Sequence, residues 1–245
     1  MNEAQLMTKI ENLYLEDPEN FLLIEIGAND GYCCDRMHKF VLKHDPKSIM
    51  VEPIKGYFEK LKQNYQHLKN INYENIALDN NEGTVTMTYI PRERIVNEEV
   101  RFRMADTPQL WKEHWAGGLG SFYTDKNNLG CPELQQYQET IEVETKTFDF
   151  LFEKYDIQSY KNVVLQTDCE GHDLVLMKSF PFHLKAPTIY ISEIYHVTRY
   201  PPSHPNFNTN KGLYTEEDEN EAKSILSNQG YDLYRSGDLI GVLRG

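Results

Sequence analysis

The sequence predicts an α/β fold in which a mostly parallel sheet carries helices on both faces. Short apolar runs alternate with segments of helical periodicity, which is typical of parallel sheets with crossover helices. Glycines and acidic side chains follow several of these runs directly. A chain of 245 residues with 40 % hydrophobic residues is long enough to bury one sizeable core. We therefore expect residues 1–245 to form a single domain.

The first half of the chain supplies three of the predicted strands and three helices. Residues 1–20 contain an amphipathic helix, because Leu6, Ile10, Leu13 and Tyr14 fall near one face. The strands are short runs rich in apolar residues, and Gly27 and Pro53 end the first two. They span Phe21–Ile26, Ser48–Glu52 and Ile71–Ala77. Helices are expected over residues 34–44 and 56–68.

The second half continues the alternation and closes the sheet. Thr84–Ile90 follows a turn signal and alternates as a half-exposed antiparallel strand does. Further strands are expected at Ile141–Thr147, Asn162–Thr167 and Thr188–Ser192, and helices at residues 148–155, 174–180 and 216–229. Two strands around Ser236-Gly237, at 231–235 and 239–244, form a hairpin. We expect a seven-stranded sheet with this antiparallel hairpin at one edge.

Residues 91–140 interrupt the rhythm of strands and helices. The segment contains both tryptophans and the glycine-rich stretch 117–120, but it has no clean periodicity. A long irregular segment inside a compact domain is usually functional. We predict an inserted lid with short helices over the active site.

Charge and cysteine content exclude several classes of partner. The formal net charge is −13, which disfavours nucleic acid and anionic membrane surfaces. The four cysteines match no zinc pattern and are expected to be reduced thiols. Neither a membrane-spanning run nor a secretion signal is evident, so we expect a cytoplasmic location and no membrane insertion. The sequence does not distinguish a monomer from a homodimer.

Polar residues at three strand ends predict a ligand site. Gly27 and Gly31 belong to a glycine-containing turn after the first strand. Glu52 ends the second strand, 25 residues after Gly27, where a carboxylate can accept both hydroxyls of a ribose. Residues 168–173, Asp-Cys-Glu-Gly-His-Asp, follow a later buried strand. Because ligands of open α/β sheets bind beyond the carboxyl ends of the strands, these groups should share one crevice.

These segments resemble the FkbM-type methyltransferases, a branch of the class I S-adenosylmethionine-dependent enzymes. The resemblance rests on short segments spanning residues 21–90 and 141–195. They are Glu25–Gly31, Val51–Pro53, Asn75–Leu78 with Glu82-Gly83, Thr147–Asp149 and Leu165–His172. It implies the Rossmann-like class I methyltransferase fold. The turn at 27–31 lacks the third glycine of a dinucleotide fingerprint, which argues against a dehydrogenase that binds NAD.

The resemblance also implies which residues bind the cofactor. The methionine portion would face Glu25 and Gly27, with Asp168 approaching its amino group, and Asn29, Asp30 and Gly31 would border it. The ribose hydroxyls would bind Glu52. The adenine would lie against Pro53 and Ile54, in a pocket closed by Asn75, Ile76 and Ala77. Glu25 departs from the usual aspartate but keeps the carboxylate, and Asp30 stands where the family often has a small or apolar residue.

Two histidines are candidates for the base that takes the acceptor's proton. His172 follows Asp168 and Glu170, which could polarise it, although a structural role at the start of the next helix is an equal alternative. His196, just past another strand, is the second candidate. Asp168 and Glu193 both end strands and could hold Mg²⁺. We favour a site without metal, in which one carboxylate meets the cofactor and the other meets a helix cap or water.

The inserted segment is expected to bind the acceptor. Arg92 and Arg94 belong to a local cluster of arginines, which suits a phosphorylated acceptor, although ion pairs with neighbouring glutamates explain the cluster as well. Trp115 and Tyr123 could stack on a sugar ring, and Glu193 faces the same site. The family resemblance implies O-methylation of a hydroxyl, on a sugar or on a nucleotide-linked or polysaccharide acceptor. The alternatives are methylation of a nitrogen or carboxyl group, or a cofactor-binding module without activity.

Overall fold

The computed structural model describes residues 1–32, 35–96, 120–123, 136–195 and 214–245. Seven strands form its main sheet, in the order β3-β2-β1-β7-β8-β10-β9. Neighbouring strands are parallel except at β10, which is antiparallel to both β8 and β9. The strands span Phe21–Ile26 (β1), Ser48–Val51 (β2), Ile71–Glu74 (β3), Asn162–Thr167 (β7), Ile189–Ser192 (β8), Tyr231–Ser236 (β9) and Asp238–Leu243 (β10). The predicted seven-stranded α/β sheet with an antiparallel edge hairpin is confirmed.

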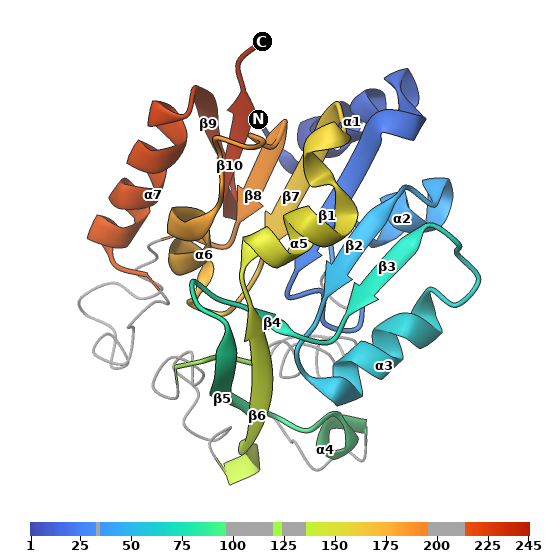
Figure 1. Cartoon of the computed structure of the whole chain (residues 1–245), viewed down its shortest axis with the longest axis vertical. Coiled ribbons are helices and arrows are strands. Elements are labelled where there is room, and N and C mark those ends of the chain that lie inside the picture. The colour runs from blue at the N-terminus through green and yellow to red at the C-terminus, as the bar shows by residue number, and fades with distance from the viewer. Residues whose placement is uncertain (33–34, 97–119, 124–135, 196–213) are drawn as a thin grey trace, which may run out of the picture.

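Helices cover both faces of this sheet, as Figure 1 shows. The apolar residues of the sheet alternate between the faces, as the pleat requires. Leu22 and Ile24 pack with α5, α6 and α7, whereas Leu23 packs with α1, α2 and α3. The helices span Glu3–Glu16 (α1), His38–His44 (α2), Lys55–Asn64 (α3), Arg92–Val96 (α4), Phe148–Tyr155 (α5), Asp173–Ser179 (α6) and Glu216–Asn228 (α7), with 3-10 turns at Pro18–Asn20 (η1) and Ile157–Ser159 (η5).

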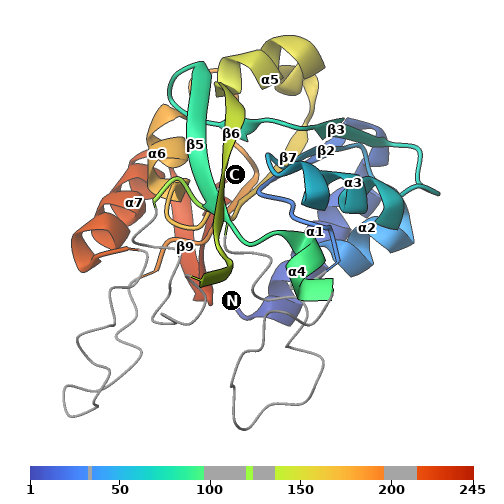
Figure 2. The same cartoon turned by 90° about the horizontal axis from the view of Figure 1, so that it is seen from below.

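A second, three-stranded sheet lies beyond the carboxyl ends of the parallel strands (Figures 1 and 2). It consists of β4 (Ala77–Leu78), β6 (Glu139–Lys146) and β5 (Gly83–Tyr89), in that order. The prediction of one strand over Ile71–Ala77 is therefore wrong, because the chain changes sheet after Glu74. The Nδ2 of Asn75 donates to the carbonyl oxygens of Glu52 and Pro53, at 2.8 and 2.9 Å, which turns the backbone away from the main sheet.

The helix expected from residue 34 begins later, at His38. Three residues of the preceding loop, Gly27, Asn29 and Gly31, have φ of 81°, 49° and 65°. Such left-handed conformations are incompatible with a helix. The loop instead leads to Asp35, whose Oδ1 accepts a hydrogen bond from the backbone N–H of Met37 at 2.7 Å.

Part of the predicted insertion at 91–140 belongs to regular structure. Residues 92–96 form α4, and β6 begins at Glu139. Ser121 and Thr88 exchange two backbone hydrogen bonds of 2.9 Å, which anchor residues 120–123 on β5. The remainder, residues 97–119 and 124–135, lies outside the described residues. In the described part of the chain, the helices are too short and too polar to cross a membrane.

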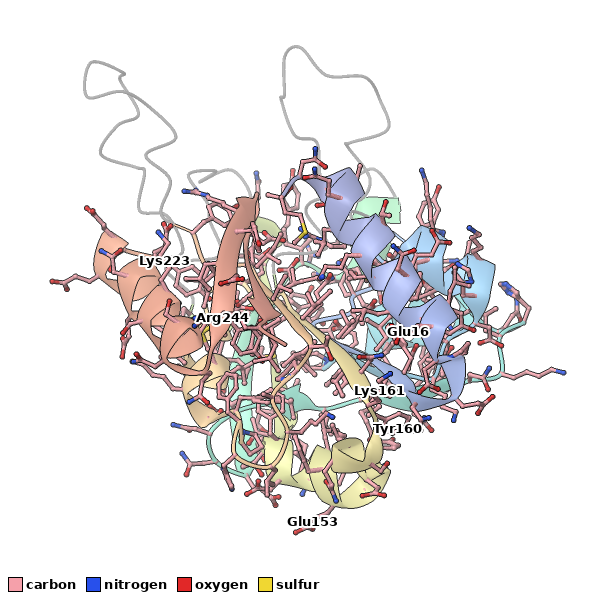
Figure 3. The ribbon with its side chains drawn as sticks, turned by 90° about the horizontal axis from the view of Figure 1, so that it is seen from above. Glu16, Glu153, Tyr160, Lys161, Lys223 and Arg244 are labelled. Carbon is pink, nitrogen blue, oxygen red and sulfur yellow. The ribbon has the colours of Figure 1, made fainter. Side chains whose placement is uncertain are left out.

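The amino ends of the parallel strands are closed by surface contacts. Figure 3 shows Glu16 at the end of α1 near Lys161 at the start of β7, and their side chains form an ion pair of 3.3 Å. Both side chains are more than half exposed, so this pair contributes little stability. The opposite end of the sheet, where the carboxyl ends of the strands meet the second sheet, is where a ligand can enter.

Candidate functional site

The turn after β1 brings the backbone of two neighbouring strands into contact. The strand order reverses between β1 and β7, so the ends of these strands form a switch point, the usual ligand position in open α/β sheets. A Cβ at Gly27 would lie 2.0 Å from the carbonyl oxygen of Asp168. Position 27 therefore requires glycine both for its positive φ and for this close approach.

A pocket opens at this switch point. Its empty space, including the part open to solvent, is about 1210 Å³. The floor comes from the ends of β1, β2, β7 and β8, and the opposite wall from β4, β5 and residues 120–122. The lining residues are Glu25–Asn29, Asp35, Val51–Ile54, Ile76–Leu78, Met87, Gly120, Phe122, Gln166, Asp168–Glu170, His172 and Glu193. The pocket thus combines an apolar wall with several acidic groups.

Glu52 holds the two loops on one side of this pocket. Its Oε2 accepts the backbone N–H of Asn29 at 2.9 Å, and its Oε1 accepts that of Ile54 at 2.8 Å. Burial raises the pKa of Glu52 to about 7, against the lowering effect of these two hydrogen bonds. Each carboxylate oxygen retains acceptor capacity beyond one hydrogen bond. Glu52 can therefore still accept hydroxyl groups of a ligand.

The apolar wall lies next to Glu52. Ile54, Ile76 and Ala77 line the pocket, and Ile76 and Ala77 are less than 7 % exposed. A Cβ at Gly120 would lie 2.6 Å from Cδ1 of Ile54, so the segment 120–123 approaches this wall closely. An apolar slot beside a hydroxyl-accepting carboxylate suits a flat base attached to a ribose.

Two acidic residues line the β1 side of the pocket. Glu25 is 2 % exposed, and its Oε1 has no hydrogen-bond partner among the described residues. Burial, followed by the charge of Asp35, raises the pKa of Glu25 well above its usual range. Burial also raises the pKa of Asp35 to about 6. Sequence spacing did not point to Asp35, because it lies in a loop outside any recognisable motif.

A second acidic group lies at the ends of β7 and β8. Asp168, Glu170 and Glu193 each offer a carboxylate oxygen, and these atoms lie within 4.8 Å of one another. Burial, followed by the charge of Asp173, raises the pKa of Asp168 to about 7. Burial, followed by the charge of Asp168, raises the pKa of Glu193 well above its usual range. Three such oxygens are a ligand set that a divalent cation accepts.

His172 lies in the same pocket and is 6 % exposed. Its Nε2 is 3.0 Å from Oδ1 of Asp79, and its Nδ1 is 3.2 Å from the hydroxyl of Tyr123. The sequence suggested Asp168 and Glu170 as the polarising carboxylates, whereas the recorded hydrogen bond to a carboxylate is to Asp79. His172 is the N-cap residue of α6, but its side chain makes no capping hydrogen bond.

Residues 120–123 join the second sheet to the loop that carries His172. The Oγ of Ser121 donates to the carbonyl oxygen of Glu170 at 2.8 Å and accepts the backbone N–H of Tyr123 at 3.1 Å. The ring of Phe122 lies 4.4 Å from the imidazole of His172, measured between centroids. This short segment therefore fixes the side of the pocket opposite the β1 turn.

Some predicted site residues lie beside the pocket rather than in its lining. Asp30 and Gly31 use their carbonyl oxygens to bind Asn64 and Tyr65 of the α3 region, and Asn75 holds the backbone at Glu52. Arg94 forms an ion pair of 2.6 Å with Glu139. Arg92 is on the same short helix, α4. His196 and Trp115 lie outside the described residues.

The fold and the pocket define a class of enzyme. A Rossmann-like sheet with a glycine turn, a buried carboxylate and a histidine in one pocket suits a methyltransferase that uses S-adenosylmethionine. Residues 25–233 match the family described as the Methyltransferase FkbM domain, and the chain belongs to this family of S-adenosylmethionine-dependent methyltransferases. A comparison with curated proteins finds no match.

Proposed function

We propose that the pocket binds S-adenosylmethionine along its floor. The adenine would lie against Pro53, Ile54, Ile76 and Ala77, and Glu52 would accept the ribose hydroxyls. The amino-acid tail would reach the turn at Gly27 and Asn29, between Glu25 and Asp168. The residues fit this cofactor because they offer an apolar slot, free acceptor capacity at Glu52 and a buried, unpartnered Oε1 on Glu25. Asp30, Gly31 and Asn75 would not contact the cofactor directly. Their hydrogen bonds would fix the backbone of the residues that line the pocket.

We propose further that the reaction is O-methylation of a hydroxyl, most naturally on a sugar or a sugar-containing acceptor. The observation that carries this proposal is the chain of side chains Asp79–His172–Tyr123, of which His172 lines the pocket. S-adenosylmethionine supplies an electrophilic methyl group. A hydroxyl acceptor must lose its proton, whereas an amine that binds in its neutral form already offers an electron pair. A hydrogen-bonded histidine beside the pocket provides the base.

His172 and its partners have separate roles in this proposal. His172 would take the hydroxyl proton, and Asp79 would hold the imidazole orientation and stabilise the charge it gains. Tyr123 would orient the acceptor hydroxyl toward the ring. Positioning of this hydroxyl contributes most of the remaining rate. Asp168 would act on the cofactor tail, and Glu193 would face the acceptor. His196 remains a second candidate for the base.

The acceptor would enter from the side of α4. Arg92 and Arg94 would recognise a phosphate on a phosphorylated or nucleotide-linked sugar. The ion pair between Arg94 and Glu139 engages one of these arginines, which favours Arg92 as the stronger contact. Trp115 would stack on the sugar ring. We also propose a cytoplasmic location, where the free thiol of Cys169 would stay reduced.

The proposal is tested by incubating the full chain with S-adenosylmethionine and a panel of sugars, sugar phosphates and nucleotide sugars. Mass spectrometry should show the gain of one CH₂ by a hydroxylated acceptor. Arg92→Gln should raise the acceptor KM for a phosphorylated sugar and leave the cofactor KM unchanged, with Lys39→Gln on the distant α2 as the matched control. Transfer to amines or carboxylates alone, with none to hydroxyls, would overturn O-methylation.

A further inference from the structure

Glu170 adopts a backbone conformation that a residue with its side chain disfavours. Its φ is 45°, and that of the following Gly171 is 101°. The backbone N–H of His172 donates to the carbonyl oxygen of Cys169 at 3.2 Å, which closes a tight turn around these two residues. Two successive positive φ angles are typical of a type I′ turn, which favours Asn-Gly or Gly-Gly at its centre. Glycine meets this preference at position 171, whereas glutamate at position 170 does not.

This turn leads directly into the proposed base. His172 follows Gly171, and its ring nitrogens contact Asp79 on one side and Tyr123 on the other. A change of φ at Glu170 would therefore redirect the imidazole relative to both partners. Strained backbone of this kind persists only where surrounding contacts hold it, and it clusters at active sites. The contacts that hold Glu170 are thus candidates for a role in the reaction.

Ser121 makes such a contact from the second sheet. Its Oγ donates to the carbonyl oxygen of Glu170 at 2.8 Å, and the residue is 1 % exposed. The same oxygen accepts the backbone N–H of Tyr123 at 3.1 Å. Two backbone hydrogen bonds of 2.9 Å with Thr88 fix Ser121 on β5. The hydroxyl therefore ties the strained turn to a strand of the second sheet.

Other hydrogen bonds fix the two ends of the turn. The carboxylate of Asp173 accepts the backbone N–H of Cys169 at 3.2 Å. The hydroxyl of Tyr214 donates to the same carboxylate at 2.8 Å. The hydrogen bond from Ser121 acts between these ends, on the carbonyl oxygen of Glu170. It therefore acts on the residue whose conformation is strained.

We propose that Ser121 is a positioning residue for methyl transfer: its hydroxyl holds Glu170 in the left-handed conformation that sets the direction of His172. The inference rests on the proposed role of His172 as the base and adds Ser121 as a residue that acts through it. Ser121 is not part of the pocket lining, so it has no direct contact to offer the cofactor. Loss of its hydroxyl should lower turnover and leave cofactor affinity unchanged.

The first measurement is the turnover of Ser121→Ala. The full chain is given S-adenosylmethionine and the sugar, sugar phosphate or nucleotide sugar that the wild type methylates fastest. The kcat should fall roughly 10- to 100-fold, since a small displacement of a catalytic group costs this much. The Kd of S-adenosylhomocysteine, measured by calorimetry, should stay that of the wild type. Retained binding also shows that the variant is folded.

Ser48→Ala is the matched control. Ser48 is also buried, and its Oγ donates to the carbonyl oxygen of Pro46 at 2.9 Å. It begins β2, at the opposite end of this strand from the pocket residue Val51. The control loses the same kind of hydrogen bond, so its thermal stability should fall comparably while its kcat stays unchanged. An equal loss of kcat in both variants would assign the effect to stability and overturn the inference.

A further variant tests the strain itself. Asparagine tolerates a left-handed φ, so Glu170→Asn should let the turn keep its conformation without the hydroxyl of Ser121. Ser121→Ala should therefore lower kcat by a smaller factor in the Glu170→Asn background than in the wild type. Equal factors in the two backgrounds would overturn the inference, because Ser121 would then not act through the turn.

The ring of His172 gives a readout that needs no acceptor. With S-adenosylhomocysteine bound, its nitrogen chemical shifts should indicate one tautomer, with the proton on the Nε2 that faces Asp79. Ser121→Ala should show a mixture of tautomers, because the ring is no longer held against Asp79. Unchanged shifts would overturn the inference.

The outcomes separate this inference from the proposed function. Unchanged kcat in Ser121→Ala would overturn the positioning role and leave the methyl transfer intact. Loss of S-adenosylhomocysteine binding in this variant would also overturn it, because Ser121 would then serve the fold or the cofactor. A wild-type chain that methylates no hydroxyl, while Ser121→Ala still alters the shifts of His172, would instead contradict the proposed function and leave the contact through Glu170 in place.

Discussion

The Nε2 of His172 lies 3.0 Å from the Oδ1 of Asp79, although 93 positions separate the two residues in the chain. The second sheet makes this contact, because β4 ends at Leu78 and delivers Asp79 to the loop that precedes α6. The carboxylate favours the tautomer with its proton on Nε2, which leaves Nδ1 to receive a proton. In the proposed mechanism Nδ1, which lies 3.2 Å from the hydroxyl of Tyr123, is then the nitrogen that takes the proton.

Replacement of His172 and of Asp79 should affect turnover differently. His172→Ala should lower kcat by roughly 10²- to 10⁴-fold, the range typical of a lost general base, while the Kd for S-adenosylmethionine changes little. Asp79→Asn should lower kcat less and shift the acidic limb of the pH–rate profile, because the imidazole loses its anionic partner. The measurement is steady-state kinetics over a pH series. Unchanged turnover in His172→Ala would remove this residue from the mechanism.

Gly27→Ala should abolish cofactor binding and lower stability. A residue with a side chain costs about 1–2 kcal/mol at a left-handed φ, and the new Cβ would meet the carbonyl oxygen of Asp168. Gly56→Ala is the matched control, because a Cβ there has nothing within 4 Å and alanine favours the helix α3. Thermal unfolding and calorimetry check both variants. Gly27→Ala that binds the cofactor as the wild type does would refute the close approach at this turn.

The buried carboxyl of Glu52 predicts a pH dependence of stability. The pKa of Glu52 is about 7 in the folded chain and 4.5 for an unburied carboxyl. Between pH 4.5 and about 7, the folded state therefore keeps a proton that the unfolded state has lost. The free energy of unfolding should therefore fall as pH rises through this window, by on the order of 3 kcal/mol from this residue alone.

Chemical denaturation of the wild type and of Glu52→Gln over pH 4.5–7 measures this slope. The wild type should lose stability with rising pH more steeply than the variant, whatever their absolute stabilities. Glu142→Gln, an exposed position on β6, is the control and should follow the wild type. Parallel slopes for wild type and Glu52→Gln would show that Glu52 does not take up a proton on folding.

Removal of metal should leave the reaction intact. The proposed roles of Asp168 and Glu193 lie with the cofactor and the acceptor, and the mechanism assigns no step to a cation. Activity should therefore persist in excess EDTA, measured as product formed over time. Loss of activity that added Mg²⁺ restores would instead place a cation at Asp168, Glu170 and Glu193, whose oxygens lie within 4.8 Å.

Much of the main sheet could be predicted from the sequence because most of its strands are short apolar runs. Phe21–Ile26 and Asn162–Thr167 have the bounds expected from periodicity. The break at Asn75 escaped prediction, since its cause is a side-chain hydrogen bond to a neighbouring strand. The helix expected from residue 34 begins only at His38, because the side chain of Asp35 accepts the backbone N–H of Met37 before the helix starts, a local contact that periodicity does not reveal.

The candidate site was predictable where its residues lie next to a strand end. Glu25, near the end of β1, and Glu52 and Asp168, each directly after a buried strand, fall in the pocket as these positions indicate. Asp35 and Asp79 escaped, because an irregular loop and the second sheet bring them in from distant parts of the chain. The contact between His172 and Asp79 forms only when the second sheet packs beyond the ends of the main sheet, so the sequence alone does not indicate it.

The most direct test of the account is to identify the product formed from S-adenosylmethionine with an isotope-labelled methyl group. Nuclear magnetic resonance should place the label on an oxygen of the acceptor, with one S-adenosylhomocysteine formed per methyl transferred, and Gly27→Ala should form no product. A label on nitrogen or carboxylate would contradict O-methylation. Product formation that survives Gly27→Ala would contradict the pocket as the site of the reaction.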